Sequence, residues 1–288
     1  MMKWDGHTHS EFCPHGSGED TEQFIKMAIK QGMTDYSITE HAPLPLEFLA
    51  RCSGAKKAID TAGIAFNDVI PYLNKMNRLK HKYRSELNIH IGFEVDYLSD
   101  YEAWTRDFLD EYGRYIDDSI LSLHFLPGTG GYRAVDYSAA DYQEGIVSYY
   151  GSFQQAQAAY FEMMSRLVRS DLGKNKPKRI GHMTLCRKFK DYFTDENIGF
   201  SKQIQDLIQH FLNEAADGGY ALDYNTSGMY KEQCREPYPP DALLELIINK
   251  HIPLVFGSDA HCSQDAARGY AHYEQRIVPI AVRPIASD

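Results

Sequence analysis

Histidine and carboxylate residues follow short apolar runs in this sequence, and they are the residues best suited to chemistry. His7 and His9 follow the first run, His41 follows the second, and Glu94 follows the third. In an extended chain, residues i and i+2 point to the same side, so His7 and His9 can reach one ion. Imidazole nitrogen suits zinc, iron and manganese. The pattern therefore predicts a metal centre.

The same arrangement recurs along the chain. Seven of the twelve histidines lie at the end of such a run or just after it, namely His7, His9, His15, His41, His124, His182 and His261. Chance explains one such histidine well, but it is a poor explanation for seven of them joined by Glu94 and Asp259. Cys13 and Cys262 neighbour the set and are candidate soft ligands. The alternative is two buried thiols without a metal, which is the commoner use of cysteine.

Seven runs with the composition of strands carry these residues, at 3–5, 35–39, 89–93, 119–123, 178–181, 220–223 and 253–258. Apolar residues at helical spacing lie between them, for example from Ser201 to Ala216. Strands that alternate with helices predict an α/β fold with a parallel sheet, and seven of them predict a closed or nearly closed barrel. In such barrels the functional groups stand at the C-terminal ends of the strands. The histidines and carboxylates are therefore expected to meet at one mouth.

The 288 residues show no internal repeat, low-complexity tract or linker, so we expect a single domain over residues 1–288. Two connections between strands are long, at about 43–88 and 128–176. Both contain helix-like stretches, and the second is rich in tyrosine. We expect both connections to be insertions that cap the mouth and shape a substrate pocket.

The charge balance indicates which partners to expect. The chain has 30 basic and 40 acidic residues, hence a formal net charge of −10, and no long basic tract. Proteins that bind nucleic acid through its phosphates usually present a basic face, so nucleic acid is not favoured. No apolar run approaches the ~20 residues of a membrane span, and the polar start is unlike a signal peptide. We therefore expect a cytoplasmic protein without a membrane partner. The five scattered cysteines argue against a disulfide framework, and no feature specifies an oligomeric state.

Four motifs resemble those of the PHP (polymerase and histidinol phosphatase) family. They are His7-x-His9 with His15, Thr39-Glu40-His41, Glu94 with His124 and His182, and Gly257-Ser258-Asp259-Ala260-His261. The resemblance runs from residue 5 to about residue 270. Within the family, segments 122–127, 181–189, 225–228 and 235–239 are most similar to the stand-alone histidinol-phosphatases. This resemblance implies a distorted (β/α)7 TIM-like barrel with the metal site at the C-terminal ends of the strands.

The resemblance also implies how three metal ions are held. The first ion would be bound by His7, His9, Glu94 and Asp259. The second would be bound by His15, His41 and His261, and the third by His124, His182 and a bridging Glu94. For His41 there is an alternative role, which is contact with the substrate phosphate. Zinc, iron and manganese all suit this donor set.

The implied activity is hydrolysis of L-histidinol phosphate to L-histidinol and phosphate, a step of histidine biosynthesis. A hydroxide bridging two metals would attack phosphorus, since a bound divalent ion can bring the pKa of water from ~15.7 towards ~7. Asp259 and His261 are the catalytic candidates, with Asp259 orienting the hydroxide. Arg187 is the first candidate to clamp the phosphate because a guanidinium matches phosphate oxygens. Arg235 and Lys231 are second choices.

Two other interpretations stay open. The first is a nuclease or nucleotide phosphoesterase built on the same site, against which the acidic charge argues modestly. The second is a non-catalytic binding module that the metals stabilise. Lost ligands would mark such a module, and no ligand position is missing here. Catalysis is therefore the favoured prediction.

Overall fold

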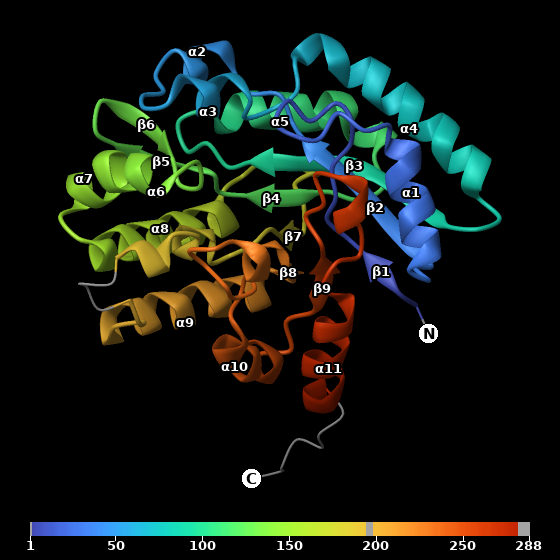
Figure 1. Ribbon diagram of the computed structural model, residues 1–288. Coiled ribbons are helices and arrows are strands. Elements are labelled where there is room, and N and C mark those ends of the chain that lie inside the picture. Colours follow the sequence, from blue (N-terminus) through green and yellow to red (C-terminus); the bar gives the residue numbers. More distant parts are fainter. Residues whose placement is uncertain (1, 194–197, 282–288) are drawn as a thin grey trace.

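Seven parallel strands form one sheet in the computed structural model, which describes residues 2–193 and 198–281 (Figure 1). In spatial order they are β1 (Trp4–Asp5), β2 (Asp35–His41), β3 (Asn88–Asp96), β4 (Ile120–Ser122), β7 (Arg179–Ile180), β8 (Ala221–Asn225) and β9 (Leu254–Gly257). The two edge strands also meet. The N–H of Gly6 donates to the carbonyl of Phe256 at 2.8 Å, and the N–H of Asp259 donates to that of His7 at 2.8 Å. The sheet therefore curls into a barrel, and the predicted distorted (β/α)7 TIM-like fold is confirmed.

Helices surround this barrel because each of the long ones has an apolar face to bury (Figure 1). They are α1 (Thr21–Lys30), α4 (Val69–Tyr83), α5 (Glu102–Tyr112), α8 (Phe153–Arg169), α9 (Lys202–Asp217), α10 (Leu244–Asn249) and α11 (Tyr270–Ala281). Helix α9 follows the predicted pattern, and its buried residues are Ile204, Ile208, Phe211, Leu212 and Ala215. The Ser201 hydroxyl accepts a hydrogen bond from the N–H of Ile204 and caps its start. None of the helices within residues 2–193 and 198–281 is long and apolar enough to cross a bilayer.

Short helical turns shape the loops between these elements. They are η2 (Gly113–Tyr115), η4 (Leu185–Arg187), η5 (Lys190–Tyr192), η6 (Ser227–Tyr230), η7 (Asp241–Leu243) and η8 (Ser263–Asp265). Of these, η4 after β7, η6 after β8 and η8 after β9 contribute residues to the cavity at the mouth of the barrel.

Each of the two long connections contains a run of short elements, which we term its capping segment, followed by a helix of the barrel wall. In the first, α2 (Leu46–Leu49), α3 (Lys56–Asp60) and η1 (Phe66–Asp68) precede α4. In the second, the antiparallel hairpin of β5 (Phe125–Gly128) and β6 (Gly131–Ala134) is followed by α6 (Ala139–Tyr142), the π-helical turn η3 (Gln143–Val147) and α7 (Ser148–Tyr150), before α8.

The two capping segments pack against each other over a small apolar cluster, to which the loop after β3 also contributes Leu98. This cap core consists of the buried residues Phe48, Leu98, Phe125, Tyr132 and Ala134. Backbone hydrogen bonds join the segments as well, since the N–H of Ser53 donates to the carbonyl of Tyr132 at 2.8 Å. The cap core is separate from the cluster that fills the barrel and its helices.

Candidate metal centre

The ends of the barrel strands bring the predicted ligands together. His41 is the last residue of β2, and the register of β2 and β3 places it opposite Glu94. His124 and His182 each lie two residues beyond their strands, β4 and β7. Altogether nine side chains border one space, and they are His7, His9, His15, His41, Glu94, His124, His182, Asp259 and His261. The architecture explains this convergence, because all seven strands of the barrel point the same way.

Glu94 stands at the centre of the group, and both of its carboxylate oxygens face imidazoles. Its Oε2 lies 3.2 Å from His7 Nε2 and 3.1 Å from His41 Nδ1. Its Oε1 lies 2.8 Å from His182 Nε2 and 3.4 Å from His124 Nε2. Glu94 is buried and faces imidazoles from the ends of four other strands, β1, β2, β4 and β7, which is the arrangement that a bridging carboxylate needs.

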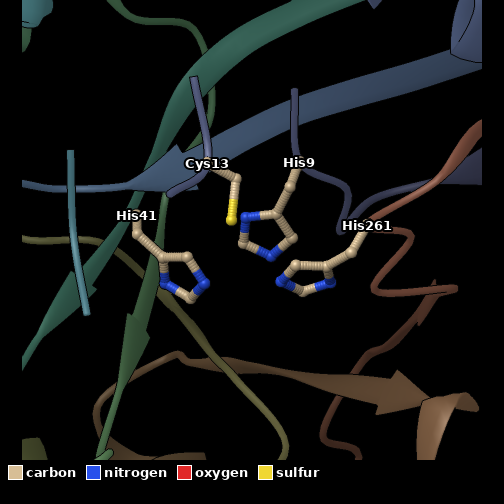
Figure 2. A group of neighbouring side chains, drawn as sticks. All are labelled: His9, Cys13, His41 and His261. Atoms are coloured by element: carbon tan, nitrogen blue, oxygen red, sulfur yellow. The ribbon is translucent and has the colours of Figure 1, made fainter. Parts of the chain in front are cut away.

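Asp259 and three stacked imidazoles form the other side of the group. Asp259 Oδ1 lies 3.2 Å from His9 Nε2. The ring of His9 stacks against those of His41 and His261, with centroids 4.2 Å and 4.1 Å away, and the centroids of His41 and His261 lie 5.8 Å apart. Figure 2 shows these three rings side by side, with the Cys13 thiol directed towards them. One possible ligand atom from each of the four lies within 4.8 Å of the others.

Several buried polar atoms in this group have no hydrogen-bond partner among residues 2–193 and 198–281. They are His7 Nε2, both ring nitrogens of His41, Glu94 Oε2 and His182 Nδ1. Buried polar atoms are rarely left unpaired, because desolvation without a partner is costly. In addition, pairs of Nε2 atoms face each other at 3.2 Å (His124 and His182) and 2.9 Å (His15 and His261). Tetrahedral zinc with Zn–N bonds of ~2.0–2.1 Å spaces its ligands roughly 3.3 Å apart, so these residues fit a metal.

Carboxylates outside the group, together with backbone carbonyls, fix how most of the imidazoles are turned. His7 Nδ1 lies 2.7 Å from Asp223 Oδ2, and His124 Nδ1 lies 2.9 Å from Asp96 Oδ1. His9 Nδ1 lies 3.3 Å from Glu40 Oε1. The Nδ1 atoms of His15 and His261 lie 2.8 Å and 2.9 Å from the carbonyl oxygens of Thr61 and Asp259. Each contact occupies Nδ1 and directs Nε2 towards the shared space, as metal-binding histidines require.

The charges in the group shift its pKa values strongly. Burial lowers the pKa of His7, but three carboxylates, with Glu94 foremost, outweigh burial and raise it well above the usual range. Burial also opposes protonation of His9, yet its hydrogen bonds to Asp259 and Glu40 raise its pKa to about 9. Burial and the neighbouring His9 lower the pKa values of His41 and His261. A raised pKa favours the protonated imidazole, so protons compete with metal for His7 and His9.

A cavity of about 430 Å³ opens above the group, a size suited to a small organic ligand. Seven of the nine residues line it, and so do parts of both capping segments. Four cationic side chains also line it, and they are Lys57, Lys188, Lys231 and Arg268. The carboxylates of Asp136 and Asp265 complete its polar wall.

Of the three predicted phosphate-binding cations, the structure brings only Lys231 to this cavity. Arg187 is buried elsewhere, where its Nε donates to Glu236 at 2.6 Å and its Nη1 to the carbonyl of Ile198 at 2.7 Å. Arg235 is exposed and pairs with Asp191 at 2.7 Å. Both guanidiniums therefore have protein partners and do not line the cavity, contrary to our expectation of a direct phosphate contact.

Comparisons with known proteins agree with this geometry. The model of the PHP domain family matches residues 5–227. The histidinol-phosphatase of Bacillus subtilis is 38% identical over 96% of this chain and 100% of its own length. The crystal structure of the putative histidinol phosphatase of Listeria monocytogenes is 49% identical and superposes with a TM-score of 0.92, covering 94% of this chain and 100% of that one. Histidinol phosphate phosphatase from Lactococcus lactis, solved with zinc, L-histidinol and phosphate, is 18% identical with a TM-score of 0.71, covering 98% and 94%.

Proposed function

The chain belongs to the PHP domain family, and we propose that it is a metal-dependent phosphomonoesterase that hydrolyses L-histidinol phosphate to L-histidinol and phosphate. One observation carries this conclusion. A chain that is similar over almost its whole length to a histidinol-phosphatase also gathers nine histidine and carboxylate side chains, of kinds that can bind metal, beneath a cavity of small-molecule size. We also retain the cytoplasm as its proposed compartment.

We propose that the nine residues hold three divalent ions. The first set is His7, His9, Glu94 and Asp259, and the second is His15, His41 and His261. The third is Glu94, His124 and His182. The two-sided contacts of Glu94 support its place in two sets. Zinc, iron and manganese all suit these donors.

When bound, such ions activate water by lowering its pKa, and they neutralise phosphate charge. The residues of the chain hold the catalytic groups in position. Asp259 Oδ2 accepts hydrogen bonds from Asn225 Nδ2 at 3.2 Å and Ser227 Oγ at 3.1 Å, which fix the carboxylate. We propose that Asp259 orients the attacking water and that His261, held through its contact with the Asp259 carbonyl, completes the catalytic pair. Lys231 is proposed to attract the phosphate, together with the cavity cation Arg268.

Phosphate release by the metal-loaded protein tests the proposal. The substrates are L-histidinol phosphate, generic phosphomonoesters, nucleotides and short oligonucleotides. We expect strong preference for L-histidinol phosphate, abolished by a chelator and by His9→Ala. His210→Ala, which removes an exposed histidine on α9 outside the site, is the matched control and should stay active. Release from nucleotides or oligonucleotides alone would favour the nuclease interpretation, and no turnover with metal bound would favour the binding module.

A further inference from the structure

The cavity has a second polar feature besides the metal-ligand group. Asp136 and Lys188 both line it, with Asp136 Oδ2 lying 3.1 Å from Lys188 Nζ, and their side chains are 30% and 20% exposed. Within residues 2–193 and 198–281, Lys188 is the one hydrogen-bond partner of the Asp136 side chain. An ionised carboxylate offers about four acceptor sites. Asp136 therefore keeps the capacity to accept hydrogen bonds from a cation that enters the cavity.

Backbone hydrogen bonds hold this pair beside two of the proposed metal ligands. The N–H of Val135 donates to the carbonyl of His124 at 2.8 Å, which fixes the chain next to Asp136. On the other side, the N–H of Leu185 donates to the carbonyl of His182 at 2.8 Å, and that of Lys188 to Leu185 at 2.9 Å. The position of the pair relative to the metal group is therefore set by the backbone.

The wall around Asp136 differs from the rest of the cavity. Tyr137 follows it in sequence, Ala134 lies two residues before it, and Phe125 pairs with Ala134 across the β5–β6 hairpin. The cations Lys231 and Arg268, by contrast, come from the loops after β8 and β9. Apart from its partner Lys188, Asp136 thus has aromatic and apolar neighbours along its own segment, while the lining cations Lys57, Lys231 and Arg268 come from other segments.

We propose that Asp136 selects the substrate by its amine, accepting hydrogen bonds from the ammonium group, with Lys188 holding the carboxylate in place. The inference rests on the proposed function and names a specificity-determining residue for it. L-histidinol phosphate carries its ammonium on the carbon next to the one that bears the phosphate ester. A phosphate held at the metal group therefore brings the ammonium close to the loops of His124 and His182, where Asp136 lies, and the imidazole meets the apolar wall.

Three substrates test this role. They are L-histidinol phosphate, its deamino analogue 3-(imidazol-4-yl)propyl phosphate, and 4-nitrophenyl phosphate. For Asp136→Asn we expect kcat/KM for L-histidinol phosphate to fall roughly 10- to 100-fold, as for a lost hydrogen bond to a charged group, while the other two change less than about threefold. The wild type should show a similar loss on the deamino analogue. Asp100→Asn, which changes a carboxylate outside the cavity that is 49% exposed, is the matched control.

Equal losses on all three substrates would overturn the inference, because they would show that Asp136 serves the fold or the metal site. An unchanged preference in Asp136→Asn would overturn it as well. If that variant does not fold, the wild type must still prefer the amine-bearing substrate over the deamino analogue by about tenfold or more, and an absent preference refutes the role. A wild type that releases phosphate from none of the three would instead refute the proposed function.

Discussion

Replacing Asp223 by Asn is expected to weaken metal binding because this carboxylate orients His7. The two side chains lie 2.7 Å apart and both are fully buried, so no water can replace the contact. Asn has nearly the same size, but it lacks the charge that helps to raise the pKa of His7. Loss of such an outer partner lowers metal affinity roughly 10- to 100-fold, which corresponds to about 1.4–2.7 kcal/mol.

The assay is a competition titration of metal against a chelator, with activity measured as a function of free metal. We expect the half-saturating metal concentration to rise roughly 10- to 100-fold. Activity at saturating metal should stay near the wild-type value. Asp35→Asn is the matched control, because Asp35 lies 3.2 Å from His90 at the start of β2, the opposite end from the ligands. Metal affinity that changes equally in both variants, or in neither, would refute the reasoning.

Three further predictions concern the fold around the site. Gly92→Ala is expected to prevent folding or to cost several kcal/mol, because the new methyl group would overlap the carbonyl oxygen of Asp118; thermal melting checks it. Hydrogen bonds, led by that from Lys82, lower the pKa of Glu22 to about 2, so its stabilising effect is complete above its ordinary pKa of 4.5 and is lost as the pH falls towards 2. The difference in unfolding free energy between wild type and Glu22→Gln, measured by urea titration, should therefore shrink as the pH falls from 4.5 to about 2. A difference that stays constant over this range would contradict the prediction. Phe48→Ala, which leaves a cavity in the cap core, is expected to lower the stability of the capping segments by about 3–5 kcal/mol. Amide hydrogen exchange should therefore rise in the capping segments more than in the barrel strands.

The barrel and the meeting of its polar strand ends could be predicted because both follow from periodicity. A short apolar run that ends in a histidine or carboxylate needs no distant information, and parallel strands bring their ends to one mouth. His41 and Glu94 illustrate this, since the register of two neighbouring strands places them opposite each other.

The direction of individual side chains in loops could not be predicted in the same way. Arg187 follows His182 closely in sequence, but in the turn η4 its guanidinium donates to Glu236, and neither residue lines the cavity. Asp136 reaches the cavity through the pairing of β5 with β6, which its local sequence does not reveal. Asp223 and Asp96 lie on strands and could have been suspected from alternation, because each lies two residues from another site residue, Asn225 or Glu94.

The separation of the cap core from the apolar cluster of the barrel has a consequence for how such a protein can evolve. The five apolar residues that hold the capping segments do not belong to the cluster that holds the strands. Mutations that reshape the cap therefore cost stability mainly within the cap, while the strand ends that carry the histidines keep their positions. New substrate preferences can accumulate on one part of the chain while the metal-binding part is inherited intact. A directed-evolution library for altered substrate range should accordingly vary the capping segments and leave the strand ends untouched.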